Sequence, residues 1–314
     1  MDRKPVSVKS YANIAIVKYW GKADAERMIP STSSISLTLE NMYTGTKLSF
    51  LPEDATGDVM YIDDELQGEK ETTKASKVLD LFRTNPNQHV KIETWNNMPT
   101  AAGLSSSSSG LSALVKAANE LFQVGKTQSE LAQIAKFASG SSSRSFFGPL
   151  AAWDKDSGEV YQVETDLKLA MIMLVLTDQK KPVSSRDGMK LCTETSTSFP
   201  EWIKQSEQDY KDMLGFLKAN DFQAVGELTE ANALRMHQTT STANPPFSYL
   251  TDASYQAMDK VKALRASGEQ CYFTMDAGPN VKVLCLEEDL DRLADHFRKD
   301  YQVIISRTKE LPDA

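Results

Sequence analysis

In the first half of the chain, hydrophobic and polar residues often alternate. In the second half, hydrophobic residues more often recur every three or four positions, as they do in helices. Apolar and polar residues alternate over 6–11, over 46–50 and, more weakly, over 59–62, which predicts strands. Residues 89–95 form a further extended segment. Beyond a short loop, apolar residues spaced by threes and fours from 111 to 122 predict a helix. The first half is therefore expected to be rich in strands.

The rest of the pattern adds elements of both kinds. Thr127 and Glu130 form a capping-box pair that predicts the start of a helix. The apolar run 167–177 predicts a strand buried on both faces. Further helices are expected near 72–82, 201–219, 222–236, 248–266 and 287–298, and further strands near 150–153, 271–275, 281–286 and 301–306. This mixture shows no internal repeat and predicts an α+β chain of two domains, 1–166 and 167–314.

The most informative stretch lies between the predicted strand 89–95 and the helix that follows. It contains Pro99, Gly103 and a run of consecutive serines from Ser105 to Ser109. The free N–H groups and dipole of a helix N-terminus attract anions, and small side chains let a phosphate approach the backbone. A flexible serine-rich linker is the alternative, but a linker does not normally join a strand to an apolar-faced helix. The stretch predicts a phosphate-binding loop, although it matches neither Gly-x-x-x-x-Gly-Lys-Ser/Thr nor Gly-x-Gly-x-x-Gly.

Composition and charge narrow the classes of partner. The chain has 314 residues and a net charge of −8, which argues against nucleic acid and anionic membranes but not against a phosphorylated small molecule. The longest apolar run, 169–176, is too short to span a membrane, and no secretory signal is visible. Cys192, Cys271 and Cys285 lie far apart, as unpaired thiols in a reducing compartment do. We therefore expect a cytoplasmic protein.

Two lysines and two aromatic residues, Lys18, Tyr19, Trp20 and Lys22, follow the predicted N-terminal strand. Lysines four residues apart could share one face of a helix. Together they could neutralise a diphosphate or the phosphates of ATP, with Tyr19 donating a hydrogen bond. A solvated basic stretch is the alternative, and spacing alone does not decide between the two.

Arg144 and Asp276 are the other candidate site residues. Arg144 stands in a serine cluster, and its planar guanidinium matches a carboxylate or a phosphate, with Ser139 and Ser141 as further donors. A structural ion pair is the alternative for this arginine. Asp276 lies between a predicted strand and a Gly-Pro turn that would present its carboxylate. An aspartate that bonds its own turn is the alternative there.

Taken together, these segments resemble the diphosphomevalonate decarboxylase family of the GHMP kinase superfamily. The resemblance extends over about residues 8–306 and rests on Ala12-Asn-Ile-Ala with Lys18-Tyr-Trp-Gly-Lys22, Pro99-Thr-Ala-Ala-Gly-Leu-Ser-Ser-Ser107, Ser139-Gly-Ser-Ser-Ser-Arg144-Ser-Phe-Phe-Gly and Met275-Asp-Ala-Gly-Pro-Asn. The Lys-Tyr-Trp-Gly-Lys and Asp-Ala-Gly-Pro-Asn segments are specific to the decarboxylase. The serine loop indicates only the superfamily.

The resemblance implies a fold and a reaction. An N-terminal domain like ribosomal protein S5 domain 2 would precede a ferredoxin-like domain, with the active site in the cleft between them. The implied reaction converts ATP and mevalonate 5-diphosphate to ADP, phosphate, carbon dioxide and isopentenyl diphosphate by phosphorylating the 3-hydroxyl, with Mg²⁺, in a homodimer. The closest alternative is a GHMP small-molecule kinase that does not decarboxylate. A non-catalytic nucleotide-binding regulatory protein fits less well, because the Lys, Arg and Asp positions are intact.

The resemblance also implies roles for individual residues. Asp276 matches the catalytic aspartate that faces the 3-hydroxyl, and Arg144, with Asn13 beside it, matches the arginine that binds the substrate carboxylate. Ser107 matches the serine that orients the ATP γ-phosphate and its Mg²⁺, and Ser106 competes for the metal because this loop carries more serines than the family pattern.

Two larger sets complete the implied site. The residues expected to line the substrate and its diphosphate are Lys18, Tyr19, Lys22, Ser139, Gly140, Ser141, Arg144, Ser185, Arg186 and Met189. The residues expected to bind ATP are Pro99, Ala101, Ala102, Gly103, Leu104, Ser105, Ser106, Ser107 and Ser108.

Overall fold

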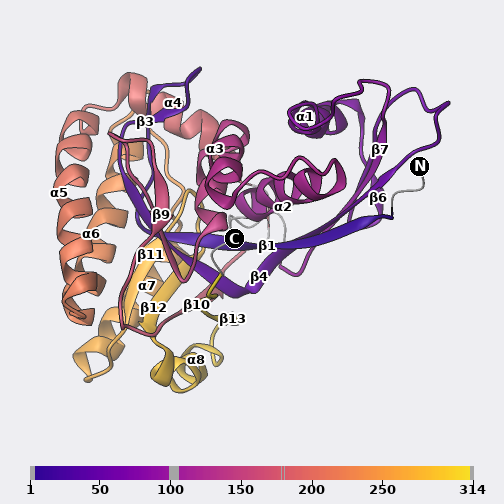
Figure 1. Ribbon diagram of the computed structural model, residues 1–314. Coiled ribbons are helices and arrows are strands. Elements are labelled where there is room, and N and C mark those ends of the chain that lie inside the picture. Colours follow the sequence, from indigo (N-terminus) through magenta and orange to yellow (C-terminus); the bar gives the residue numbers. More distant parts are fainter. Residues whose placement is uncertain (1–3, 99–105, 178, 180, 312–314) are drawn as a thin grey trace.

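Two β-sheets, built from consecutive halves of the chain, organise the fold (Figure 1). The computed structural model describes residues 4–98, 106–177, 179 and 181–311. The seven-stranded sheet contains β1 (Val6–Val17), β4 (Ser34–Phe50), β5 (Val59–Ile62), β6 (Glu65–Leu66), β7 (Val90–Asn96), β8 (Leu150–Trp153) and β9 (Val160–Gln162). The four-stranded sheet contains β10 (Leu169–Val175), β11 (Tyr272–Met275), β12 (Val281–Leu286) and β13 (Gln302–Arg307).

The long strand β4 is the centre of the larger sheet. It pairs with β1, with β7 at one of its ends and with β8 at the other. Along the β1 pairing, the partner of Tyr11 is Tyr43, but the partner of Asn13 is Thr38. Such a bulge bends the paired strands and re-aims the side chains beyond it. Asn13 lies directly beyond this bulge.

Helices cover one face of the larger sheet. They are α1 (Glu69–Leu79), α2 (Ser106–Leu121) and α3 (Gln128–Ala138), followed by the 3-10 helix η1 (Gly140–Phe146). Their buried faces share a core with the sheet, in which Val115 packs with Ile92 and Leu48. The predicted capping box of Thr127 and Glu130 begins α3. η1 in turn contacts β1 and β8 of this sheet.

Helices also cover the smaller sheet. The helices of this half are α4 (Ser185–Thr195), α5 (Phe199–Lys218), α6 (Phe222–Ser241), α7 (Asp252–Ala266) and α8 (Leu290–Phe297). In the first half, β2 (Lys22–Asp24) and β3 (Ile29–Pro30) form a separate two-stranded sheet. In Figure 1, α5 and α6 lie side by side at the left. One core cluster combines Ile14 and Leu37 of the larger sheet with Met171 and Tyr272 of the smaller one. The two halves therefore share part of their core.

Most predicted elements are present, and the differences have local causes. The apolar strand 167–177 is confirmed as β10, buried along nearly its whole length. The pattern gave no helix at α4, where Gly188 and few apolar residues weaken the helical signal. It also missed the first part of β4, in which buried serines and threonines replace the usual alternation. Among the described residues, no helix has the length and apolar character needed to cross a membrane.

Candidate active site

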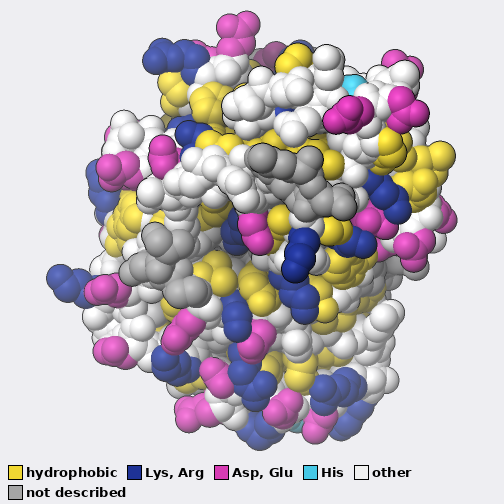
Figure 2. Space-filling view, turned by 45° about the vertical axis from the view of Figure 1, so that its right-hand side comes forward, with side chains coloured by type: hydrophobic (Ala, Val, Ile, Leu, Met, Phe, Trp, Pro, Cys, Tyr) yellow, Lys and Arg dark blue, Asp and Glu magenta, His cyan; other side chains and the backbone are white. Residues whose placement is uncertain are grey.

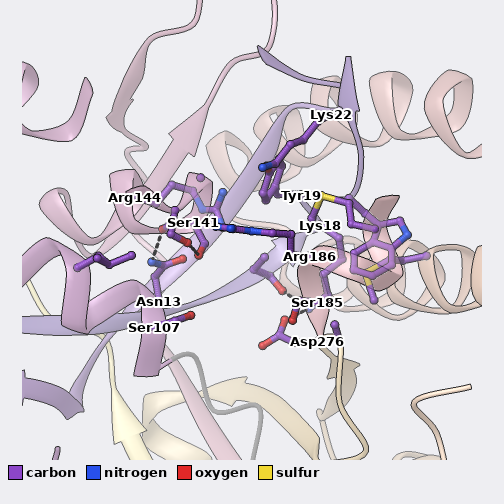
Figure 3. A pocket seen from close by; sticks show the side chains of 18 of the residues that line it. Asn13, Lys18, Tyr19, Lys22, Ser107, Ser141, Arg144, Ser185, Arg186 and Asp276 are labelled. Carbon is purple, nitrogen blue, oxygen red and sulfur yellow. Dashed lines mark hydrogen bonds and ion pairs between the residues drawn. The ribbon is translucent and has the colours of Figure 1, made fainter. Parts of the chain in front are cut away.

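A cavity of about 480 Å³ receives side chains from both halves of the chain (Figure 3). Its lining contains every residue predicted to contact the substrate, together with Asn13, Ser107 and Asp276. The lining also includes Ala15, Trp20, Met28, Leu111, Ala138, Lys181, Met236 and Ala277. The structure thus brings together six sequence segments that lie apart along the chain, namely 13–28, 107–111, 138–144, 181–189, 236 and 276–277.

Asp276 stands at the end of β11 with two ammonium groups against its carboxylate. Its Oδ1 lies 2.8 Å from Lys18 Nζ, and its Oδ2 lies 3.0 Å from Lys282 Nζ. Burial alone would raise the pKa of Asp276, but the two lysine charges outweigh burial and hold the pKa well below its ordinary value. The side chain is 22% exposed, so a ligand in the cavity can reach it. This carboxylate is an ion-pair partner and not the cap of its own turn.

The turn that carries Asp276 is fixed to the neighbouring strand. Asn280, at the end of the turn, is 1% exposed and accepts hydrogen bonds from the backbone N–H groups of Leu176 and Thr177 at 2.7 and 3.1 Å. Ser254 donates to the carbonyl of Pro279 at 2.7 Å. The tight Gly-Pro turn predicted from the sequence therefore presents Asp276 from a rigid support.

Lys18 is buried at the point where the chain leaves β1. Its Nζ donates to the Ala15 carbonyl at 2.6 Å and to Asp276. Burial lowers the pKa of Lys18 to about 8, although the Asp276 carboxylate opposes that change. The prediction that Lys18 and Lys22 share a helical face is wrong, because Lys18 follows a strand and Lys22 begins β2. The positive φ of Gly21 turns the chain between them.

Arg144 projects from η1 and is 2% exposed. Its Nε donates to Ser36 Oγ at 3.0 Å, and one terminal nitrogen donates to Ser34 Oγ at 2.6 Å. Among the described residues it has no ion-pair partner, so a structural ion pair does not account for its burial. Burial lowers the pKa of Arg144 to about 10, and Asp276 opposes this change, so the group stays cationic. A buried, unpaired guanidinium facing a cavity is suited to an anionic ligand.

Asn13 and the serines around Arg144 hold η1 in place. The Asn13 amide donates to the Ser141 carbonyl at 2.9 Å and to Ser145 Oγ at 2.8 Å. The Ser139 and Ser141 hydroxyls lie 3.3 Å apart and line the cavity. Asn13 therefore lies beside the arginine segment, as predicted, and tethers it.

Tyr19 and Gly140 make a close contact at the same end of the cavity. A Cβ added to Gly140 would lie 2.9 Å from the rings of Tyr19 and Trp153, so only glycine fits there without a shift. Burial raises the pKa of Tyr19 to about 12, and the charges of Arg144 and Arg186 oppose this. The Tyr19 hydroxyl therefore stays protonated as a hydrogen-bond donor.

Ser185, Arg186 and Met189 enter the cavity from α4. Lys181 Nζ donates to Ser185 Oγ and to the Ala277 carbonyl, both at 2.6 Å, which joins this helix to the Asp276 turn. Burial lowers the pKa of Lys181 to about 8. Burial also lowers the pKa of Lys22, with the charge of Arg186 adding to the effect.

Part of the predicted phosphate loop lies outside the described residues, namely Pro99, Ala101, Ala102, Gly103, Leu104 and Ser105. Ser106 begins α2, and Ser107 in the first turn is exposed and lines the cavity. Ser108 is 1% exposed and does not line it. Within the described ranges, no group of His, Cys, Asp and Glu side chains could hold a metal ion by itself. Ser107 is thus the described loop residue best placed for a nucleotide phosphate.

The cavity is strongly cationic in a chain of net charge −8. Among the described residues, its lining contains Lys18, Lys22, Arg144, Lys181 and Arg186 and one carboxylate, that of Asp276. Figure 2 shows several basic side chains, with acidic ones among them, near the middle of the face in view. Such a local excess of positive charge attracts anions and lowers the free-energy cost of binding a ligand with several negative charges.

Sequence reasoning missed four residues at or behind this site: Lys181, Asn232, His237 and Lys282. Lys282 carried a signal, because it interrupts the apolar run of β12, where it is 1% exposed. His237 is 6% exposed. Burial, assisted by the charge of Lys18, lowers the pKa of His237 to about 4 and keeps it neutral. The sequence around Asn232 and around Lys181 contains no motif that distinguishes these residues from polar residues on the protein surface.

A two-domain α+β fold with a cationic cavity and a held carboxylate is the class of structure that suits a small anionic ligand. Two family models match the chain. The diphosphomevalonate decarboxylase-like N-terminal domain matches residues 10–163, and the mevalonate 5-diphosphate decarboxylase C-terminal domain matches residues 171–311. The chain belongs to the diphosphomevalonate decarboxylase family.

Individual relatives agree with this assignment. A mevalonate pyrophosphate decarboxylase from Streptococcus pyogenes is 66% identical, with a TM-score of 0.97 over 100% of this chain and 99% of the other. A structure described as "MDDEF in complex with MVAPP, AMPPCP and Magnesium" is 40% identical, with a TM-score of 0.90 over 98% of both chains. The diphosphomevalonate decarboxylase of Candida albicans is 30% identical over 94% of this chain and 88% of its own length. The fold and family expected from the sequence are confirmed.

Proposed function

We propose that this chain catalyses the ATP-dependent decarboxylation of mevalonate 5-diphosphate to isopentenyl diphosphate, with release of ADP, phosphate and carbon dioxide. The observation that carries this proposal is the placement of Asp276 and Arg144 in one cavity. Asp276 is held by two lysines, and the Arg144 guanidinium has no ion-pair partner among the described residues. The reaction needs one group to act on an alcohol and another to hold a carboxylate.

Asp276 is assigned to the 3-hydroxyl of the substrate. Lys18 and Lys282 keep it ionised, so it can accept a hydrogen bond from that hydroxyl and orient the oxygen toward the γ-phosphate. A carboxylate with a lowered pKa is a weak base. It becomes sufficient as the oxygen bonds to phosphorus, because the hydroxyl proton is then far more acidic. The proton passes to Asp276 late in the phosphoryl transfer.

Arg144 is assigned to the substrate carboxylate. After transfer, the bond between C3 and its phosphorylated oxygen breaks, and phosphate leaves with that electron pair. The electrons of the bond between C1 and C2 then form the double bond between C2 and C3, and carbon dioxide departs. Asp276 first returns the proton to the transferred phosphate, which leaves as hydrogen phosphate, and the regenerated Asp276 carboxylate stabilises positive character that develops at C3. Arg144 holds the departing group in line, and strong binding in the ground state alone would not accelerate this step.

The lining also fits the other expected ligands. The residues assigned to binding the substrate and its diphosphate are Tyr19, Lys22, Ser139, Ser141, Ser185, Arg186 and Met189. Lys18 contributes through its ion pair with Asp276. Bound Mg²⁺ would neutralise phosphate charge, and its preference for oxygen ligands with several retained waters suits the exposed hydroxyl of Ser107. The ligands named for the 40% identical structure support ATP and magnesium as partners. Ser106 remains the competing metal ligand.

One coupled assay tests the proposal. The protein is incubated with ATP, Mg²⁺ and mevalonate 5-diphosphate labelled at C1, and the release of ADP, phosphate and labelled carbon dioxide is followed together. The proposal predicts equal amounts of the three products. A GHMP kinase would release ADP alone, and a nucleotide-binding regulatory protein would release no product that depends on the substrate.

Three broader expectations belong to the same proposal. The boundary between residues 166 and 167 is supported by the separation of the two sheets. A homodimer and a cytoplasmic location stay predictions. Light scattering on the purified chain measures the first of these, and a mass of twice 34.8 kDa is expected.

A further inference from the structure

The backbone of Lys18 is held by a helix from the other half of the chain. Lys18 is the first residue after β1, and its N–H donates to Asn232 Oδ1 of α6 at 2.8 Å. Asn232 is fully buried and does not line the cavity. Its direct contact with a residue that lines the cavity is the one with Lys18.

The orientation of the Asn232 amide is set by Asp209 of α5. Asn232 Nδ2 donates to Asp209 Oδ2 at 2.8 Å. A carboxylate only accepts hydrogen bonds, so the amide nitrogen must face Asp209 and the amide oxygen must face Lys18. Asp209 is 1% exposed, forms an ion pair with Arg235 and accepts a further hydrogen bond from Gln205 at 3.2 Å. The amide consequently has a single satisfied orientation.

The same two helices hold the residues that follow Lys18. Trp20 donates its indole N–H to Thr239 of α6 at 2.9 Å, and its carbonyl accepts from the Trp202 indole of α5 at 2.8 Å. Thr32 donates to the Lys18 carbonyl at 3.2 Å. The segment from Lys18 to Trp20 has no regular secondary structure of its own, so α5 and α6 determine its course.

We propose that Asn232 is a positioning residue for the Lys18–Asp276 ion pair, locked in its working orientation by Asp209. The contacts run from Arg235 through Asp209 and Asn232 to Lys18, and from Lys18 Nζ to Asp276 Oδ1. This inference rests on the proposed function, because it assigns a role in that reaction. A displacement of about 1 Å at a reacting group can lower the rate by about 100-fold.

A reciprocal exchange of amide and carboxylate tests the proposal. Asn232→Asp keeps the acceptor for the Lys18 N–H but places a second carboxylate against Asp209, so the pair separates and Lys18 shifts. The double variant Asp209→Asn with Asn232→Asp restores the bond between the two side chains, because the new amide at 209 donates to the new carboxylate at 232. In the wild type Asp209 Oδ2 accepts from both Asn232 and Arg235, so Arg235 has to move its contact to the carboxylate at 232. The net charge of the pair is unchanged, and Arg235 stays one helical turn from the new carboxylate on the same helix.

The measurements are kcat, the KM for each substrate and the midpoint of thermal unfolding. Asn232→Asp is expected to lower kcat by about 10- to 100-fold with the KM for ATP within about threefold of wild type. The double variant is expected to regain kcat to within about fivefold. Asp58→Asn serves as the control. Asp58 is also a buried carboxylate paired with an arginine, Arg83, but it does not line the cavity, so this variant loses thermal stability and keeps kcat.

Each outcome bears on the proposal. A kcat that is unchanged in Asn232→Asp at a lowered unfolding midpoint would make Asn232 a purely structural residue and overturn the inference. A double variant that keeps the wild-type unfolding midpoint but stays inactive would also overturn it, because the bond between positions 209 and 232 is then present without the rate. If the double variant does not fold, the kcat of Asn232→Asp decides alone. A wild-type protein that releases no carbon dioxide would instead refute the proposed function, and the two failures are thereby distinguished.

Discussion

At Arg144 a buried positive charge is held by two hydroxyl groups, those of Ser34 and Ser36. Hydroxyls fix the direction of the guanidinium without neutralising it, so the charge stays available to an anion in the cavity. The serine-rich pattern around Arg144 predicted a bound anion but left a structural ion pair open. The structure decides against the ion pair, because the partners of Arg144 are Ser34 and Ser36. These serines lie over a hundred residues away along the chain, and no sequence motif marks them as partners of Arg144.

Arg144→Lys tests this use of the guanidinium. Lysine keeps the charge but cannot form both hydroxyl contacts while it faces the substrate. Losing one charged hydrogen bond costs about 1.5–3 kcal/mol, so kcat/KM should fall about 10- to 100-fold. Arg83→Lys is the matched control, because Arg83 is equally buried but pairs with Asp58 away from the cavity. Equal kcat/KM values for wild type and Arg144→Lys would show that Arg144 has no part in substrate binding.

The lysines of the cavity predict how activity depends on pH. Burial lowers the pKa of Lys18 and of Lys181 to about 8. As pH rises through about 8, Lys18 loses its ion pair with Asp276 and Lys181 loses its attraction for anions, so kcat/KM should decline on the alkaline side. Lys116→Met is the control. Burial lowers the pKa of Lys116 to about 8 as well, but Lys116 does not line the cavity, so the decline should persist unchanged in this variant.

The loss of activity should precede unfolding. The folded pKa of Lys18 lies below its ordinary value of 10.5, so between about pH 8 and 10.5 the unfolded state binds more protons than the folded state. Stability contributed by this group therefore rises with pH in that interval. Circular dichroism recorded beside the assay checks this. Unfolding that coincides with the activity loss would contradict the assignment of the decline to the cavity lysines.

At the scale of elements, η1 approaches the rings of Tyr19 and Trp153 closely at Gly140, which lines the cavity. Gly140→Ala would place a methyl 2.9 Å from Tyr19 and Trp153, so one ring or η1 must move. We expect a loss of about 1–3 kcal/mol in unfolding free energy and a fall of at least tenfold in kcat/KM. Gly215→Ala is the matched control, since its Cβ would meet open space within α5, and it should stabilise the helix.

Elements with a strong periodic or capping signal could be predicted from the sequence. The capping box at Thr127 and the continuous apolar run of β10 are examples in which neighbouring residues carry the signal for the element. α4 and the first part of β4 could not be predicted, because their stability depends on distant partners. Cys192 and Met189 of α4 pack in a cluster with Trp20 and Trp202, which no window of neighbouring residues contains.

The candidate site divides in the same way. Lys18, Arg144 and Asp276 stood out because a motif surrounds each of them. Asn232 and Lys181 act through contacts that only the folded chain creates. Lys282 lies between these cases, since a charged residue within an apolar strand was visible in the sequence. The residues that could be predicted lie in local motifs, whereas those that were missed depend on tertiary contacts, which the sequence does not show.

At the scale of the whole molecule, the shared core predicts that both halves unfold together. Ile14, Leu37, Met171 and Tyr272 belong to one cluster that joins the two sheets. Met171→Ala, at a fully buried position, should lower the unfolding free energy by about 2–5 kcal/mol. Tryptophan fluorescence and far-ultraviolet circular dichroism should show coincident urea transitions before and after the substitution. Two separated transitions, with only one shifted by Met171→Ala, would contradict a common core.

The central claim is that Asp276, held by Lys18 and Lys282, acts on the substrate hydroxyl in a cavity shared with Arg144. The most direct measurement is the rate of carbon dioxide release by Asp276→Asn at concentrations of ATP and mevalonate 5-diphosphate shown by calorimetry to saturate it. The amide can neither take the proton nor stabilise positive charge at C3. The account predicts a kcat lower by about 1,000-fold or more with both ligands still bound. A kcat within tenfold of wild type would contradict it.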